Sequence, residues 1–415
     1  MTALRVAVVA ACPFPYPRGT PVRAARLSES LARLGHEVHV ATYHVGQEEV
    51  DPLLRVWRIR GPGRIRPLEP GPSLAKLAIL DPLLLATFRR MLARHGPFDV
   101  IHAHHYEGLL LALAARRGRF SGVPVIYDAH TLLETELPSY RGLAPRLLLR
   151  TCGRIMDGYL PRRADHVVAA SDVLRDRLIA SLAVDPDHVT TIGNGVERAA
   201  FVEPSDGAGP PGDGGIIVYA GNLADYHRPD LLLEAFAAIL RIRSNATLRI
   251  YTDSPTEPVR QRARVLGIDT RVEIGSVAFP HLSEALAAAD VAVNPRPVCE
   301  GVPQKNLNYM AAGLPLAAFP GSLHPYVDGE TGVAAATVDG AGLAGAILRL
   351  LDRPRHAARL GLTAQTQARE TFTWAAAARR AEEVFRRSIE ARRRRVPQPV
   401  PAISRSERSP PPPHR

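Results

Sequence analysis

Residues 300–315 read EGVPQKNLNYMAAGLP and follow a short apolar run, Val291–Val293, that predicts a buried strand. Lys305 falls just inside a predicted helix, which a glycine and a proline then end. A strand end, a loop and a helix N-terminus are the elements from which α/β proteins build phosphate sites. The chain has only two lysines, Lys76 and Lys305, beside fifty arginines, which favours a specific role for Lys305. The alternative is a chance lysine on a solvated helix face.

Apolar runs that predict strands alternate with helical segments along the whole chain, beginning with a strand at Val6–Ala10. A loop at Pro13–Pro21 and a helix at Val22–Leu34 follow this first strand. The alternation predicts an α/β fold with doubly wound parallel sheets, covered by helices on both faces. Residues 203–215, EPSDGAGPPGDGG, interrupt the pattern and predict a linker. We therefore expect two Rossmann-like domains that face a cleft and bind ligands beyond the carboxyl ends of their strands.

The composition of this 415-residue chain fits a cytoplasmic protein. Its three cysteines are far apart and odd in number, so they predict neither a disulfide framework nor a zinc site. We see no secretory signal, and no stretch reaches the roughly 18 uncharged apolar residues that span a bilayer. The nearest, Leu74–Leu92, contains charged residues and a proline, which predicts a break near Asp81-Pro82.

More than half of the formal charge of +11 comes from residues 392–415, which hold seven arginines and one glutamate. This proline-rich segment predicts a disordered basic tail. Such a tail suits contact with anionic lipid, although a solvated tail without a function is an equal alternative. The positive charge that remains for the rest of the chain is too small to favour a nucleic-acid partner.

The order of landmarks along the chain resembles that of retaining glycosyltransferases of the GT-B fold, in glycosyltransferase family 4 (group 1). The resemblance covers roughly residues 4–390. Its segments are PYPRGTPVRAARLSESLARLGHEVHV (15–40), DVIHAHH (99–105), PVIYDAHTL (124–132), ADHVVAASDVLRDRL (164–178), VTTIGNGVE (189–197), VYAGNLADYHRPDLLLEAF (218–236) and ADVAVNPRPVCEGVPQKNLNYMAAGLPLAAF (289–319).

The resemblance implies an enzyme that transfers a sugar from a nucleoside diphosphate to an acceptor hydroxyl, with retention and without a metal or other cofactor. The acceptor would be a lipid-linked glycan, a polysaccharide precursor or a secondary metabolite. The implied organisation is an acceptor-binding domain (1–200), a linker (201–215), a nucleotide-sugar-binding domain (216–375), a helix that returns to the first domain (376–391) and the tail (392–415).

The resemblance also implies site residues. Lys305 and Arg228 would bind the diphosphate, Glu300 the donor sugar, and His130 the donor sugar or the acceptor, with these four as the catalytic candidates. The further substrate-binding candidates are Gly19, Thr20, Gly221, Asn222, His227, Gly301, Val302, Pro303, Gln304 and Asn308.

The chain departs from the family pattern at Asn222, His227 and Asn308, where the family usually has arginine, lysine and glutamate. These departures leave open a non-catalytic relative that binds a sugar or nucleotide. A sugar-nucleotide epimerase on the same fold is a third hypothesis, which the chain supports less because it offers no carboxylate array.

Two further features have competing interpretations. His102, His104 and His105 suggest a metal site, but no carboxylate or cysteine nearby in the sequence completes a ligand set, so we predict no metal. The helical regions Leu74–Leu92 and Pro145–Arg163 are basic and apolar. They suit a peripheral position on the inner face of a membrane, and equally suit ordinary outer helices packed on a sheet.

Overall fold

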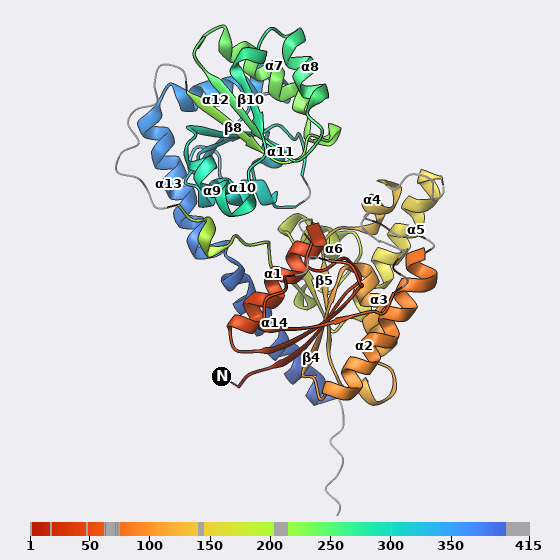
Figure 1. The fold of residues 1–415 in the computed structure, drawn as a ribbon. Coiled ribbons are helices and arrows are strands. Elements are labelled where there is room, and N and C mark those ends of the chain that lie inside the picture. Colours follow the sequence, from red (N-terminus) through yellow and green to blue (C-terminus); the bar gives the residue numbers. More distant parts are fainter. Residues whose placement is uncertain are drawn as a thin grey trace, which may run out of the picture.

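The computed structural model describes residues 2–16, 19–46, 49–61, 63, 71, 73, 75–139, 145–202, 215–299 and 301–395. Two parallel sheets organise this part of the chain, one in each half (Figure 1). We call the half built on the first sheet the N-terminal unit and the other half the C-terminal unit. The predicted α/β fold with two doubly wound sheets is confirmed. Glu300, most of the predicted linker and residues 396–415 lie outside the described residues.

The sheet of the N-terminal unit has the strand order β3-β2-β1-β4-β5-β6-β7, and every neighbouring pair is parallel. Its inner strands are buried along almost their whole length because helices cover both faces. The strands are β1 (Arg5–Ala10), β2 (Glu37–Thr42), β3 (Leu54–Arg58), β4 (Val100–His104), β5 (Val125–Ala129), β6 (His166–Ala169) and β7 (Val189–Thr191).

The sheet of the C-terminal unit has the order β10-β9-β8-β11-β12-β13, again with parallel neighbours. Its strands are β8 (Ile216–Ala220), β9 (Thr247–Tyr251), β10 (Val272–Gly275), β11 (Val291–Asn294), β12 (Leu316–Ala318) and β13 (Gly332–Ala334). In both sheets the strand order reverses beside the first strand, so the connections that leave β1 and β4, or β8 and β11, run to opposite sides. Ligands of doubly wound sheets bind at such switch points.

Helices fill the connections in both units. The N-terminal unit has α1 (Gly19–Arg33), the π-helical turn η1 (Lys76–Leu80), α2 (Asp81–His95), α3 (His105–Ala115), α4 (Leu133–Glu136), α5 (Arg146–Tyr159) and α6 (Asp172–Ala180). The C-terminal unit has α7 (Pro229–Leu240), α8 (Glu257–Val265), α9 (Phe279–Ala287), α10 (Gln304–Ala311), α11 (Pro320–Leu323), α12 (Gly340–Leu351) and α13 (Pro354–Thr371). The predicted break near Asp81-Pro82 coincides with the change from η1 to α2.

The last helix, α14 (Trp374–Arg395), crosses from the C-terminal unit and lies along α1 in the N-terminal unit (Figure 1). Trp374, Ala378 and Phe385 are buried in the same apolar cluster as β1. The helix extends four residues into the segment predicted to be disordered, residues 392–415, so that prediction is wrong for residues 392–395. Arg392 gives the reason, since it pairs with Asp165 at 3.0 Å and is held by the N-terminal unit.

Helix α1 begins at Gly19, three residues before the predicted start at Val22. Pro21 closes the predicted loop, but a proline in the first turn of a helix breaks no hydrogen bond, because the amides of that turn have no partner within the helix. The prediction that Pro13–Pro21 is loop throughout is therefore wrong for its last three residues. Gly19 and Thr20 form the first turn of α1, which points toward the C-terminal unit (Figure 1).

Candidate active site

Lys305 lies at the switch point of the second sheet, in the first turn of α10, and its ammonium group points back toward β8. Its Nζ donates hydrogen bonds to the hydroxyl of Tyr219 (2.9 Å) and to Nδ1 of His227 (3.3 Å). It also lies 4.3 Å from the centre of the Tyr219 ring. Burial and the nearby charge of Arg296 lower the pKa of Lys305 to about 7. No carboxylate among the described residues forms an ion pair with Lys305.

Gly221 lets Lys305 reach this position. A Cβ atom at Gly221 would lie 3.0 Å from Nζ of Lys305 and 3.2 Å from the hydroxyl of Tyr219. The backbone has φ +150°, which side chains rarely adopt. The next residue, Asn222, is exposed and donates a hydrogen bond to the hydroxyl of Tyr226 at 3.3 Å. The predicted candidates Gly221 and Asn222 thus lie in the same group of side chains as Lys305.

His227 is a neutral member of this site. It is buried, and its pKa falls to about 3 because of that burial and the neighbouring Lys305 and Arg296. Nδ1 of the neutral ring accepts the hydrogen bond from Lys305. His227 therefore orients Lys305 and adds no positive charge at neutral pH.

Arg228, a predicted diphosphate ligand, already has an acidic partner. Its guanidinium forms a bidentate pair with Asp230, with distances of 2.9 Å from Nε and 2.7 Å from Nη2. Its backbone is left-handed, with φ 54°, at the N-cap of α7. A phosphate at Arg228 would have to compete with the carboxylate of Asp230.

The remaining predicted candidates of the C-terminal unit lie along the loop and helix around Lys305. Gly301, Val302 and Pro303 form the half-buried loop that precedes α10. Asn308 is half-buried one turn after Lys305, and therefore on the same helix face. Gln304 points elsewhere, because its Nε2 donates a hydrogen bond to the carbonyl oxygen of Gly195 in the N-terminal unit at 3.0 Å.

In the N-terminal unit the predicted candidates Thr20 and His130 bind each other. The Thr20 hydroxyl lies 2.9 Å from Nδ1 of His130, and Nε2 of His130 lies 3.3 Å from a carboxylate oxygen of Asp128. A ring that carries its proton on Nε2 fits both contacts, so Thr20 donates and Asp128 accepts. Burial lowers the pKa of His130, although Asp128 opposes this effect. Both nitrogens of the neutral ring are thus engaged, which leaves no free base at this position.

Asp128 also binds Arg23, and this buried ion pair anchors the start of α1. Arg23 Nε lies 2.8 Å from one oxygen of Asp128 and Nη2 lies 3.2 Å from the other. Both side chains are almost fully buried, at 3% and 0% exposed. Arg23 also donates to the side chain of Asn194 at 3.1 Å. Helix α1 is thereby fixed over the ends of β5 and β7.

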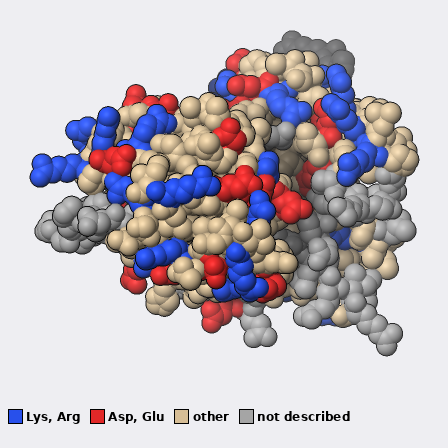
Figure 2. Space-filling view, turned by 90° about the horizontal axis from the view of Figure 1, so that it is seen from above, with Lys and Arg blue, Asp and Glu red and all other residues tan. Residues whose placement is uncertain are grey.

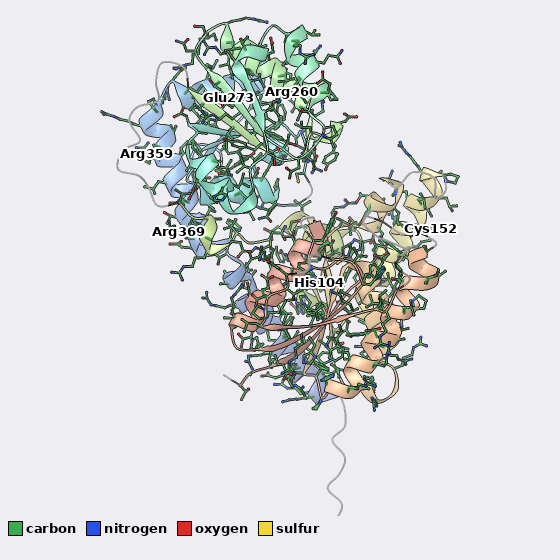
Figure 3. All side chains as sticks on the ribbon, viewed as in Figure 1. His104, Cys152, Arg260, Glu273, Arg359 and Arg369 are labelled. Carbon is green, nitrogen blue, oxygen red and sulfur yellow. The ribbon has the colours of Figure 1, made fainter. Side chains whose placement is uncertain are left out.

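The structure supplies the carboxylate that the histidine motif lacked in the local sequence. His102, His104 and Asp128 are buried with candidate ligand atoms within 4.8 Å of one another. Figure 3 shows His104 in the interior of the N-terminal unit, among the ends of the strands. Arg23 already binds both oxygens of Asp128, so a dication would have to displace a buried guanidinium or lie beside it. The geometry therefore favours a hydrogen-bonded cluster under His130.

Contacts connect the two groups of candidates across the units. Lys305 is next to Gln304, which binds Gly195, and Gly195 is next to Asn194, which binds Arg23. Arg23 lies one helical turn after Thr20. The first turn of α1 and the first turn of α10 therefore belong to one region between the units, at the switch points of both sheets.

Sequence reasoning missed several members of this region. Tyr219 and Arg296 flank Lys305, while Arg23 and Asp128 support His130. Tyr219 carried a usable signal, because it precedes Gly221 by two residues on a predicted strand. Arg23 and Asp128 carried none, since 105 positions separate them.

The family models, the sequence relatives and the solved structures that match this chain all point to one class of enzymes. The family model described as Glycosyltransferase Family 4 matches residues 17–199, and that described as Glycosyl transferases group 1 matches residues 214–353. A D-inositol 3-phosphate glycosyltransferase of Frankia alni is 31% identical over 399 residues, which cover 89% of this chain and 95% of that protein.

Solved structures of the same architecture agree. Sucrose-phosphate synthase from Thermosynechococcus elongatus superposes with a TM-score of 0.76 at 20% identity, covering 94% of this chain and all of that one. Anabaena HepE, in complex with UDP and glucose, gives a TM-score of 0.67 at 17% identity and covers 92% of this chain and all of that one. The fold is thus that of the GT-B glycosyltransferases. The chain belongs to glycosyltransferase family 4, in the group 1 glycosyltransferases, and is a glycosyltransferase.

Proposed function

We propose that this enzyme transfers a sugar from a nucleoside diphosphate to an acceptor hydroxyl, with retention at the anomeric carbon and without a divalent metal. The observation that carries the proposal is the ammonium group of Lys305. It lies at a switch point, beside a glycine that permits close approach, without an acidic partner among the described residues. A diphosphate supplies the negative charge that this site lacks.

The chemistry requires stabilisation of charge that develops on the leaving diphosphate. The bond between the anomeric carbon and the phosphate oxygen breaks, and a bond from the acceptor oxygen forms on the same face. Lys305 and the N-terminal amides of α10 stabilise the departing oxygens. The acceptor proton passes to the leaving diphosphate, because both ring nitrogens of His130 are engaged by Thr20 and Asp128. Cationic side chains thus take the role that a metal plays in other transferases.

Four further candidates keep a role in substrate binding, as parts of this proposal. Glu300 binds the hydroxyls of the donor sugar, and Asn308 binds the ribose with an amide that both donates and accepts. Gly19 and Thr20 place the positive end of the α1 dipole on the diphosphate. The UDP bound by HepE supports a nucleotide donor here. The acceptor is a lipid-linked glycan, a polysaccharide precursor or a secondary metabolite.

Calorimetry with a panel of uridine, guanosine and adenosine diphosphate sugars tests the donor site. We expect one donor to bind the wild type and to lose at least about tenfold in affinity in Lys305→Met. Lys76→Met, which removes the other lysine, is the matched control. If no donor binds the folded wild-type enzyme, the proposal fails.

Turnover tests the chemistry once the donor is known. Release of nucleoside diphosphate in acceptor mixtures should continue after chelation of divalent metals, and the product should keep the anomeric configuration of the donor by NMR. An epimerase would instead convert the donor with no acceptor present. Restoration of activity by magnesium or manganese alone would overturn metal independence.

We also propose that α5 rests on an anionic membrane surface. Its outer face exposes Leu147 (77%) and Ile155 (66%), and Figure 3 shows Cys152 of this helix at the outer edge of the N-terminal unit. Arginines flank these apolar side chains, at positions 146, 150 and 154. The opposite face is held by Asp157, which accepts hydrogen bonds from the amides of Leu133 and Glu134. Apolar anchors flanked by arginine are typical of helices that lie in a membrane interface.

Every helix in the described part of the chain is too short or too polar to cross a bilayer, so any membrane contact made by these residues is peripheral. Sedimentation with phosphatidylcholine vesicles, with and without phosphatidylglycerol, tests this proposal. We expect binding only with phosphatidylglycerol, and a loss of binding in the double variant Leu147→Gln/Ile155→Gln. Leu362→Gln, at a residue 51% exposed in the C-terminal unit, is the matched control. Equal binding of all three proteins would contradict the role of α5.

Basic side chains on the face drawn in Figure 2 are scattered and mixed with acidic ones. That face therefore offers no continuous basic stripe of the kind that follows a nucleic-acid backbone. We keep nucleic acid out of the proposed partners.

A further inference from the structure

Arg296 lies in the loop after β11 and is connected to Lys305 through two aromatic side chains. Its guanidinium carbon is 5.2 Å from the ring centre of Tyr226. The ring of Tyr226 lies 4.2 Å from that of His227, centre to centre, and His227 accepts a hydrogen bond from Lys305. Arg296 thus belongs to the same group of side chains as Lys305, at the switch point of the second sheet.

The positive charge of Arg296 is not neutralised by the described residues. Its Nε donates to the carbonyl oxygen of Val298 at 2.7 Å, and its backbone amide donates to the side chain of Asn294 at 3.4 Å. Neither contact is to a carboxylate, and the described acidic side chains form no ion pair with it. Arg228 is the opposite case, because Asp230 binds it with two nitrogens. The two arginines therefore differ in how much charge each can offer to a ligand.

Electrostatic effects show that Arg296 acts on this site. After burial, Arg296 is the largest cause of the lowered pKa of Lys305. It also contributes to the lowered pKa of His227, after burial and Lys305. Like charges held together in a half-buried site destabilise each other until an anion enters. Asn222, which donates a hydrogen bond to the hydroxyl of Tyr226, brings no charge.

We propose that Arg296 is the second diphosphate-binding cation of the site, that it acts together with Lys305, and that Arg228 does not have this role. This inference rests on the proposed donor site, and it names a ligand that the sequence did not distinguish among fifty arginines. Its position over the Tyr226 ring and its hydrogen bond to the carbonyl oxygen of Val298 order the planar guanidinium before the ligand arrives, which favours bidentate contact with phosphate oxygens.

Binding of UDP, GDP and ADP to three proteins tests the inference. The proteins are the wild type, Arg296→Gln and the matched variant Arg228→Gln. For the nucleotide that binds the wild type, we expect affinity to fall about tenfold or more in Arg296→Gln and less than about threefold in Arg228→Gln. An unchanged affinity in Arg296→Gln overturns the inference and leaves the donor site intact. Absence of binding to the wild type instead counts against the proposed function itself.

A second measurement separates a charge effect from a structural one and needs no nucleotide. The chain has only two lysines, so NMR of lysine labelled with ¹³C at Cε gives two signals, and Lys76→Arg assigns them. We expect the pKa of Lys305 to rise by roughly half a pH unit in Arg296→Gln and to stay constant in Arg228→Gln. A Lys305 pKa that does not respond to Arg296 shows that the two cations do not share a site, and overturns the inference.

Discussion

Gln304 of the C-terminal unit donates a hydrogen bond from Nε2 to the carbonyl oxygen of Gly195 in the N-terminal unit, at 3.0 Å. Gly195 packs against the start of α14, and a Cβ atom there would lie 2.3 Å from the backbone nitrogen of Trp374. The first turn of α10, which carries Lys305, is therefore attached to the point where the chain crosses back. The position of the proposed donor site and the contact between the units thus depend on the same residues.

A second glutamine allows this relationship to be tested. Gln365 is buried and donates to the carbonyl oxygens of Val202 (2.7 Å) and Ala311 (2.8 Å). We expect Gln365→Ala to lower the free energy of unfolding by about 1–3 kcal/mol, because it removes a buried side chain together with its two hydrogen bonds. Gln304→Ala should change stability by less than about 1 kcal/mol, but weaken donor binding several-fold. Urea unfolding and calorimetry on both variants check the difference, and equal effects on binding would contradict it.

Lys305 should make donor binding depend on pH. Its pKa in the free enzyme is lowered to about 7 by burial and by Arg296, so the amine is mostly charged at pH 6 and mostly neutral at pH 8. A diphosphate binds the charged form, so affinity should fall above pH 7, by up to about tenfold per pH unit. Calorimetry in two buffers of different ionisation enthalpy should show proton uptake. Lys305→Arg, which stays charged, should show neither effect.

The buried carboxylate of Glu107 should lower the stability of the folded protein as pH rises through about 6. Burial raises its pKa to about 6, although His105 and Lys76 oppose this effect. The folded state therefore disfavours the ionised form, so stability is greatest below the ordinary pKa of about 4.3 and is lost as pH rises through 6. Glu107→Gln should raise the free energy of unfolding by about 2 kcal/mol at pH 8 and change it little at pH 4. Thermal unfolding of the wild type and of Glu107→Gln between pH 4 and pH 8 checks this prediction. The same pH dependence in both proteins would contradict it.

The sequence was most predictive where both faces of a strand are buried. The predicted runs Val6–Ala10 and Val291–Val293 lie within β1 (Arg5–Ala10) and β11 (Val291–Asn294), because a buried parallel strand is a continuous apolar run. Helix α13 was not predicted, although it is 18 residues long. Its alanine, glycine and threonine side chains give a weak apolar stripe, and its identity as a helix depends on packing against α10 and α12.

The candidate site was predictable only in its local part. Lys305 follows a predicted strand at the start of a predicted helix, so its position along the chain was enough to select it, and the family resemblance supplied Gly221. The residues that hold His130 in place were not predictable, because Arg23, Asp128 and Asn194 come from three distant segments of the chain. Arg228 and Arg296 look alike in the sequence, and only their partners in the structure distinguish them.

The ion pair between Arg23 and Asp128 provides the last prediction. Asp128→Asn leaves the guanidinium buried without a counter-charge, so we expect a loss of about 3–5 kcal/mol in the free energy of unfolding. Arg23→Met/Asp128→Leu removes both charges and should recover most of that loss. The double variant should nevertheless remain impaired in turnover. The carboxylate of Asp128 accepts a hydrogen bond from His130, and without it neither the ring of His130 nor its contact with Thr20 is fixed. Urea unfolding and turnover on both variants separate the two effects, and full activity in a stable double variant would show that the pair has no part in positioning His130.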